Sequence, residues 1–371
     1  MFGDYLHLKP EWPRYRWDAS VLAVALADIH VRRGTLSSAM AALGFESRQQ
    51  EILQVIVQDV TRSSEIEGEH LDHGQVRSSI ARRLGIACYG LPEPTRDVDG
   101  VVEMMLDATQ GFREPLTEER LSAWHASLFP TGMSGMTRII TGAYRDDSKG
   151  PMQVVSGPVG RDRVHFQAPD ASRLPAEMAQ FINWFEEEQI DPVVKAAIAH
   201  LWFVTIHPFE DGNGRIGRAI MDMALSRADG DSQRFYSMTA QIHKERKQYY
   251  AELERASKDT LDVTPWLVWF VARLSDALSE SERVVNAVRR KQNFWDIHQD
   301  SGLNERQSKI VNLMLDGFSG KLQTAKYAKI TKCSNDTALR DLSDLVSKGI
   351  LMKSDQGGRS TSYNLAIVVD L

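Results

Sequence analysis

The sequence predicts a mostly α-helical chain with one β-hairpin and a smaller C-terminal module of three helices and two strands. Three observations predict this fold class. Apolar residues recur at helical spacing through most of residues 1–285, short β-branched runs flank glycine and proline in residues 153–166, and residues 304–371 carry three helical patterns before two strand-like runs. We expect an N-terminal helical region over 1–110, a core over 111–285, a linker helix over 286–303 and a terminal domain over 304–371.

The composition is that of an ordinary globular protein. The 371 residues are 42% hydrophobic and 25% charged, with a net charge of −6. No apolar run reaches about 18 residues, so we expect no membrane span, and the first residues lack the apolar core of a secretory signal. Cys88 and Cys333 are far apart, which predicts no disulfide framework and a cytoplasmic location. The acidic balance argues against nucleic-acid binding by the surface as a whole.

One of the early helical segments has an unusually polar end. Apolar residues recur at i, i+3, i+4 and i+8 from Ile52, as on a packed helix face. The segment then reads SSEIEG, in which Ser63 and Glu67 are four apart and share a helix face, and Gly68 is typical of a helix end. On spacing alone, the simplest interpretation of Glu67 is a solvated side chain near a helix end.

Two further helices and a hairpin are expected before the middle of the chain. Residues 97–112 are amphipathic, and residues 117–128 form a second helix with Thr117 as its N-cap. Residues 132–160 are rich in glycine and lack a helical period. Residues 153–166, which overlap their end, predict a β-hairpin, for which a plain surface loop is the alternative.

The segment HPFEDGNGRIGR, residues 207–218, carries the densest polar chemistry of the chain. It follows the apolar run 198–206, which predicts a buried helix that delivers His207 to its end. A helical pattern resumes from Arg215, so the glycine turn 212–214 lies at a helix N-terminus, where free N–H groups favour an anion. The alternative is a helix–loop–helix turn that binds nothing, but such a turn needs no histidine, acid or arginine pair.

These residue types together suit a nucleoside polyphosphate. Asp211 offers an oxygen ligand for Mg²⁺, and Asn213 can donate to phosphate from within the turn. Arg215 and Arg218 are three apart on one helix face, where guanidinium groups suit phosphate oxygens. His207 can accept a proton from an attacking hydroxyl at neutral pH. The set predicts phosphoryl or nucleotidyl transfer.

Other chemistries fit the sequence less well. A P-loop NTPase is excluded because no GxxxxGK[ST] run occurs. A zinc site on His207 is disfavoured because no HExxH motif is present and the two cysteines are far apart. Metal-assisted hydrolysis by a histidine–aspartate site is kept as an alternative.

HPFEDGNGRIGR resembles the Fic family signature HPFx[D/E]GNGRxxR and matches it at every specified position. The resemblance implies a Fic-type helical core that transfers AMP from ATP to a Tyr, Thr or Ser hydroxyl of a protein and releases pyrophosphate. It also implies roles for the residues. His207 would be the base, Asp211 would hold Mg²⁺, the Gly212–Gly214 turn would cradle the α- and β-phosphates, Arg215 would contact the phosphates, and Arg218 would hold the γ-phosphate.

SSEIEG is similar to the Fic inhibitory motif [S/T]xxxE[G/N], with Ser63, Glu67 and Gly68 at the specified places. In the class of Fic proteins that carries this motif before the core, the glutamate pairs with the second signature arginine. That residue is Arg218 here. The resemblance therefore implies an autoinhibited enzyme, in which Glu67 occupies the guanidinium that the γ-phosphate needs.

The resemblance, which covers about residues 10–285, also assigns the hairpin and a tyrosine pair. In the Fic fold a β-hairpin flap aligns the target segment by strand addition, and residues 153–166 would be this flap. Tyr249 and Tyr250 begin a helix and are more often core residues on pattern alone, whereas relatives place a Tyr-Tyr pair at the adenine and ribose. Some relatives carry an asparagine where this chain has Ser257, which leaves selectivity for adenine open.

The C-terminal module is basic, with 13 Lys and Arg against 9 Asp and Glu over residues 286–371. Its helix, helix, helix, strand, strand order resembles a winged helix-turn-helix domain. The residues expected to contact DNA are Thr337, Arg340 and Arg359. The alternative is contact with a protein or a second copy, because Asp336, Asp341 and Asp344 add negative charge to the recognition helix.

The leading hypothesis is an autoinhibited protein adenylyltransferase, with Mg²⁺ as cofactor, ATP as substrate, and another protein or the chain itself as target. Two alternatives remain. One is a DNA-binding regulator whose Fic site only senses nucleotide, and the other is a hydrolase that removes AMP from a modified protein. A homodimer is left open.

Overall fold

The computed structural model describes residues 5–43, 45–87, 90–156, 163–231, 233–258, 260–318, 320–354 and 361–366. The chain divides into two compact units, Met1–Ser281 and Glu282–Leu371. The described residues are mostly helical with a few short strands, so the predicted mostly α-helical class is confirmed.

The first unit is built from helices, three of which are long. Its elements in chain order are η1 (Leu6–Leu8), α1 (Ala19–Ala41), α2 (Phe45–Ile66), α3 (His73–Arg83), α4 (Arg96–Gln110), α5 (Glu118–Leu128), β1 (Met133–Ser134), β2 (Thr137–Arg138), β3 (Gln153–Ser156), β4 (Arg163–Gln167), η2 (Ala171–Arg173), α6 (Leu174–Glu187), α7 (Pro192–Ile206), α8 (Asn213–Asp229), α9 (Met238–Lys244), α10 (Arg246–Ala256) and the first part of α11 (Thr264–His298). The predicted N-cap Thr117 accepts a hydrogen bond from Arg120 N at the start of α5.

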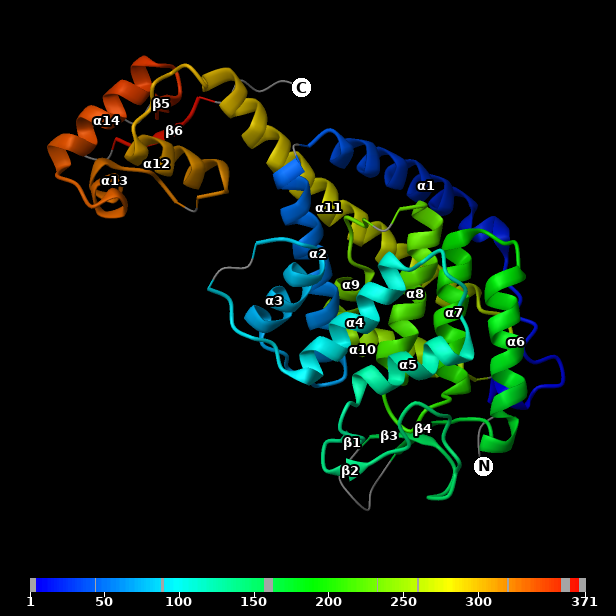
Figure 1. The fold of residues 1–371 in the computed structure, drawn as a ribbon. Helices are drawn as coiled ribbons and strands as arrows, with labels where there is room; N and C mark the ends of the chain where they lie inside the picture. The colour runs from blue at the N-terminus through cyan, green and yellow to red at the C-terminus, as the bar shows by residue number, and fades with distance from the viewer. Residues whose placement is uncertain are drawn as a thin grey trace. The chain divides into compact units, whose positions relative to one another are not determined.

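The antiparallel pair α7 and α8 forms the centre of this unit (Figure 1). α7 is apolar on nearly every side and almost wholly buried, as expected of a helix surrounded by others. The two helices approach closely at Gly217. A Cβ there would lie 2.9 Å from Val204 Cγ1 and 3.3 Å from His200 Nδ1. The glycine therefore sets how tightly α8 packs on α7.

Further helices pack around this pair. α2 contacts α3, α4, α8 and α9, and α4 contacts α5 and α8. Gly100 on α4 lies against the last turn of α5 so closely that a Cβ would be 1.8 Å from Ser127 O. Figure 1 shows α2 (blue) beside α3 and α4 (cyan).

Two small antiparallel sheets lie between α5 and α6. β1 pairs with β2, and β3 pairs with β4 from Gln153–Gln167 to Ser156–Arg163, with a register shift between Val154 and Val155. The predicted hairpin over residues 153–166 is therefore present as two paired strands. Its turn, residues 157–162, lies outside the described residues.

The boundary between the units falls inside a helix. The sequence predicts a separate linker helix over 286–303, but α11 is one helix from Thr264 to His298. No glycine and no further proline follows Pro265 until Gly302, so nothing in the sequence interrupts the helix at residue 286.

The second unit contains the predicted order of helix, helix, helix, strand, strand. After the end of α11 come α12 (Glu305–Leu315), α13 (Thr324–Thr331), α14 (Asn335–Ser347), β5 (Leu351–Lys353) and β6 (Tyr363–Leu365), and the two strands pair antiparallel. Asn304 and Gln307 form a reciprocal capping box at α12, and Ser334 caps α14. The winged helix assignment stays a prediction, and Arg359 lies outside the described residues.

In the part of the chain that the structure describes, no helix combines the length and apolarity that a membrane crossing requires. The single cysteine described, Cys333, is free.

Candidate functional site

His207 lies at the C-terminal end of α7 in a left-handed conformation, with φ 53° and ψ 57°. Pro208 follows it and disfavours continuation of the helix, and the His207 N–H still bonds Phe203 O at 3.0 Å. His207 Nδ1 lies 3.1 Å from Val204 O, which assigns the proton to Nδ1 and leaves the lone pair on Nε2. Burial lowers the pKa of His207 to about 4, so the imidazole is neutral at pH 7.

The glycine turn after His207 is fixed by its own asparagine. Asn213 Oδ1 accepts from Phe209 N at 3.0 Å, and Asn213 Nδ2 donates to Phe209 O at 2.8 Å. Gly212 has φ 81° and forms the N-cap of α8. The predicted glycine turn at a helix N-terminus is therefore present. The side chain of Asn213, predicted to donate to phosphate, instead closes the turn here, which leaves its backbone N–H for a ligand.

Arg218 is fully buried and held by the end of α2. It donates from Nε to Ser63 Oγ at 2.9 Å, from Nη2 to Ser63 O at 2.9 Å, and from Nη2 to Glu67 Oε1 at 2.8 Å. The predicted pairing of Glu67 with Arg218 is thus present, and Ser63 adds to it. Among the described residues, Arg218 Nη1 is buried without a hydrogen-bond partner, so one nitrogen of the guanidinium keeps its N–H groups unused.

The Glu67 carboxylate also lies over the first turn of α8. A Cβ on Gly214 would be 2.2 Å from Glu67 Oε1, so only a glycine lets the carboxylate approach this backbone. Gly68, with φ 86°, ends the segment just after α2. The carboxylate therefore occupies the place where an anion would meet the N-terminus of α8.

Arg215 has an acidic partner that sequence reasoning missed. Its Nη1 lies 2.6 Å from Glu69 Oε2, and its guanidinium lies over the ring of Phe129 at 5.0 Å. The Arg215 side chain is nearly buried, whereas that of Glu69 is 46% exposed. Burial raises the pKa of Glu69 although Arg215 opposes the shift. Both signature arginines are thus paired with glutamates two residues apart.

The tyrosine pair divides between the core and the site. Tyr249 is buried, and its hydroxyl lies 2.8 Å from Nε2 of the buried His200. Tyr250 is 40% exposed, and its hydroxyl donates to Ile66 O at 3.2 Å and lies 3.4 Å from Glu67 Oε2. Tyr250 therefore faces the end of α2, while Tyr249 packs as a core residue would.

Asp211 is the predicted metal ligand at the opposite side of the turn. Its carboxylate accepts hydrogen bonds from Ser134 and, at 2.6 Å, from Gly212 N. Among the described residues no cluster of three metal-ligating side chains occurs. A single carboxylate fits Mg²⁺, which is commonly held by one or two carboxylates, substrate phosphates and water.

Strand β4 of the hairpin is tied to α10, the helix that carries Tyr249 and Tyr250. Glu254 on α10 contacts His165 at 2.7 Å and Arg163 at 3.3 Å, and Lys258 lies 2.7 Å from the same carboxylate. Hydrogen bonds from Lys258 and His165 outweigh desolvation and lower the pKa of Glu254 to about 2. These contacts tie β4 to α10.

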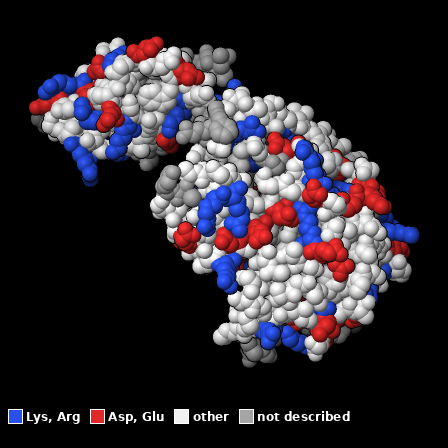
Figure 2. Space-filling view, viewed as in Figure 1, with Lys and Arg blue, Asp and Glu red and all other residues white. Residues whose placement is uncertain are grey.

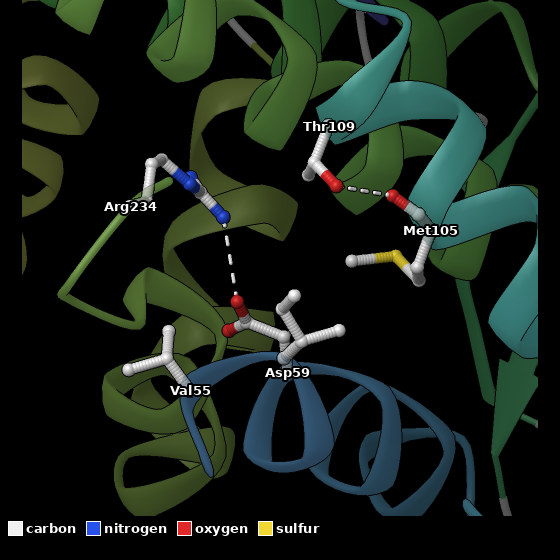
Figure 3. Close-up of a pocket in the computed structure, with 6 residues that line it drawn as sticks. Val55, Asp59, Met105, Thr109 and Arg234 are labelled. Atoms are coloured by element: carbon white, nitrogen blue, oxygen red, sulfur yellow. Dashed lines mark hydrogen bonds and ion pairs between the residues drawn. The ribbon is translucent and has the colours of Figure 1, made fainter. Parts of the chain in front are cut away.

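A buried ion-pair cluster fixes α2 two turns before Glu67. Arg234 lies 3.3 Å from Asp59 on α2 and 2.7 Å from Asp222 on α8, and Ser237 donates to Asp59. Figure 3 shows Arg234 reaching toward Asp59 across a pocket also lined by Val55, Met105 and Thr109. Burial, with Asp222 adding, raises the pKa of Asp59. This cluster holds α2 in the register that brings Ser63 to Arg218.

Two family models match the chain. Residues 115–225 match the Fic/DOC family, and residues 5–86 match a domain of unknown function, DUF4172. The chain is 27% identical over 248 residues to "Protein adenylyltransferase fic-1" of Caenorhabditis elegans, a match that covers 66% of this chain and 44% of that protein. It is 37% identical over 107 residues to "Protein adenylyltransferase Fic" of Drosophila mojavensis, covering 28% of this chain and 20% of that protein. The chain thus spans less than half the length of these curated relatives.

The fold comparison extends over most of the chain. A crystal structure of a Fic family protein from Desulfovibrio desulfuricans G20 matches with a TM-score of 0.52 at 22% identity, covering 92% of this chain and 95% of that one. A Fic domain containing signaling protein from Bacteroides thetaiotaomicron matches with a TM-score of 0.51 at 21% identity, over 71% of this chain and 95% of that one. At these identities the likeness concerns the fold. With its complete signature between the end of α7 and the first turns of α8, its matching family model and its Fic-fold neighbours, the chain contains a Fic/DOC domain over residues 115–225.

Proposed function

We propose that this protein is an autoinhibited protein adenylyltransferase, which transfers AMP from ATP to a hydroxyl group of a target protein. The observation that carries the proposal is the position of the Glu67 carboxylate, 2.8 Å from Arg218 Nη2 and directly over Gly214 at the start of α8. A carboxylate held there stands in for phosphate oxygens. The names of the curated relatives support the transfer of AMP.

The residues suit this reaction as follows. Arg218 and Arg215 would hold phosphate oxygens once the two glutamates leave, and the first turn of α8 would cradle the α- and β-phosphates. Asp211 would hold Mg²⁺, which would neutralise phosphate charge. The target hydroxyl oxygen would bond to the α-phosphorus while the bond to the bridging oxygen breaks, and pyrophosphate would leave. His207 Nε2, unprotonated at pH 7, would take the hydroxyl proton.

Tyr250 supports a nucleotide pocket beside this cradle. Its hydroxyl is within 3.4 Å of Glu67, so its ring lies at the edge of the space that the glutamate occupies. Tyr249, which is buried, would support the pocket by packing behind Tyr250. The flap over residues 153–166 would present the target segment by its strand edges.

The test uses wild type, Glu67→Gly and Glu67→Gly/His207→Ala with α-labelled ATP and Mg²⁺, and follows label on the protein itself and in a cell lysate. Strong label in Glu67→Gly alone, lost in the double variant, is the expected result. ATP binding without label in any variant would contradict transfer. Loss of AMP removal from a labelled protein in Glu67→Gly would instead support a hydrolase, in which Glu67 orients water.

The C-terminal unit supports a second role, DNA binding through α14. Two of the three acids that oppose DNA contact are engaged inside the unit. Asp341 bonds Arg306, Tyr327 and Asn304, and Asp344 bonds Gln307 and Lys348. Arg340 is exposed, and Figure 2 shows further Lys and Arg side chains on this unit, with acidic ones among them.

Binding of duplex DNA by the full chain, measured against salt concentration, tests this role. We expect an affinity that falls as salt rises and that weakens in Arg340→Ala. Binding that neither salt nor Arg340→Ala changes would favour a protein partner or a second copy for this unit.

A further inference from the structure

The buried Arg145 connects the predicted base to both ends of the flap. It lies between β2 and β3, and its side chain is 2% exposed. Arg145 Nε donates to His207 O at 2.8 Å, and the backbone N–H of Arg145 donates to Pro208 O at 3.0 Å. One residue therefore holds two successive carbonyl groups at the start of the signature.

The opposite edge of the same guanidinium holds the chain around the flap. Arg145 Nη2 donates to Pro169 O, two residues after β4, and Nη1 pairs with Asp147, ahead of β3. Asp147 in turn accepts from Ala171 N at 2.6 Å. The planar guanidinium thus holds the carbonyl groups of His207 and Pro169 and the carboxylate of Asp147 in fixed directions, which a lysine could not reproduce.

His207 needs such support because of its backbone. With φ 53° it is one of three described residues other than glycine with a positive φ, a conformation that costs free energy unless its surroundings maintain it. The bond to its carbonyl fixes the peptide plane after His207, while Val204 O fixes the ring. The direction of Nε2 depends on both.

We infer that Arg145 is a positioning residue, which sets the direction of His207 Nε2 and its place relative to the flap that holds the target. This inference rests on the proposed AMP transfer. It requires that Arg145 change catalysis and target binding while nucleotide binding, which uses α8, stays intact.

The experiment compares Arg145→Met and Arg145→Lys in the Glu67→Gly background. The matched control is Arg227→Lys, because Arg227 also donates to carbonyl groups, Phe112 O and Glu114 O, and pairs with Glu186 outside the site. The measurements are ATP affinity and stoichiometry, the kcat of transfer and the KM for target protein, and the tautomer of the His207 ring by ¹⁵N NMR.

For Arg145→Met we expect a fall in kcat of tenfold or more, a raised KM for the target protein and mixed His207 tautomers, while ATP affinity and stoichiometry stay unchanged. Arg145→Lys should restore kcat and KM only in part. Arg227→Lys should behave as the Glu67→Gly parent does. A wild-type kcat and tautomer in Arg145→Met would overturn the inference, as would a loss of ATP stoichiometry equal to the loss of transfer. If Glu67→Gly itself transfers nothing, the proposed function fails, and the His207 tautomer still decides the role of Arg145.

Discussion

The carboxylate of Glu67 lies 2.8 Å from Nη2 of Arg218, and the pair joins the end of α2 to the second signature arginine. The Arg218 side chain is fully buried, while that of Glu67 is 30% exposed. Solvent can therefore reach the Glu67 carboxylate but not the Arg218 guanidinium.

Replacing Glu67 by Gly should strengthen ATP binding more than ADP binding, because the freed Arg218 gains only the γ-phosphate as a new partner. We expect about tenfold tighter ATP binding, equivalent to roughly 1.4 kcal/mol, by titration calorimetry. Glu65→Gln is the control, since Glu65 pairs with Arg62 and His243 instead. Equal gains for ATP and ADP would argue against a γ-phosphate site at Arg218.

Replacing Glu69 by Gln should release Arg215 without releasing Arg218. Because Glu69 is about half exposed, the pair is worth at most about 1 kcal/mol, so we expect nucleotide affinity to rise no more than about fivefold. Transfer should stay low until Glu67 is also replaced. A Glu69→Gln variant that labels targets as strongly as Glu67→Gly would show that Glu69 is the main brake.

Two helix glycines should respond oppositely to alanine. At Gly100 a Cβ would be 1.8 Å from Ser127 O, so Gly100→Ala must move α4 from α5 and should lower the free energy of unfolding by about 2 kcal/mol or more. At Gly34 on α1 an added Cβ would meet nothing within 4 Å beyond the adjacent backbone of its own helix, and Gly34→Ala should stabilise by about 0.5–1 kcal/mol. Urea unfolding of both variants measures this, and a stable Gly100→Ala would refute the close packing.

Stability should fall in mild acid. Burial lowers the pKa of His7, His125, His200 and His207 to about 4, whereas unfolded histidines titrate near 6.5. As pH falls from about 6.5 to 4 the unfolded chain binds more protons, so stability that is complete above about 6.5 is lost, by up to about 1.4 kcal/mol per pH unit and histidine. The raised pKa of Asp59 acts in the opposite direction.

The pH dependence of urea unfolding tests this sign. Fully buried His200 provides the matched variant, since His200→Gln should reduce the slope between pH 6.5 and 4 by about one proton. An unchanged slope in His200→Gln would mean that His200 is protonated in the folded state.

Local pattern was enough to predict the helices and the turn that carry the signature residues. The apolar period of α7, the glycine turn and the helical spacing of α8 place His207 and Arg218 within one short segment. The pairing of Glu67 with Arg218 spans 151 residues, and the resemblance supplied it where spacing alone could not.

The residues that were missed depend on contacts between distant segments. Glu69 follows the end of α2 and belongs to no helical pattern. Arg145 is one of 44 Lys and Arg residues and lies outside the helices and strands. Their partners become neighbours only once the helices pack. The side chain of Asn213 shows the same limit, because a residue type that suits phosphate also suits a turn, and only the fold decides.

Gly214 matters both when the Glu67 carboxylate occupies the start of α8 and when, under the proposed function, phosphate would occupy it. The backbone of Gly214 admits the Glu67 carboxylate, and under the proposed function the same backbone would admit phosphate, so the carboxylate and the substrate would compete for the start of α8. A change in α8 that strengthened binding of the carboxylate would also strengthen binding of phosphate. Under the proposed function, a release signal would therefore act on α2 and the residues just after it, where it would withdraw Glu67 and Glu69 from the two arginines.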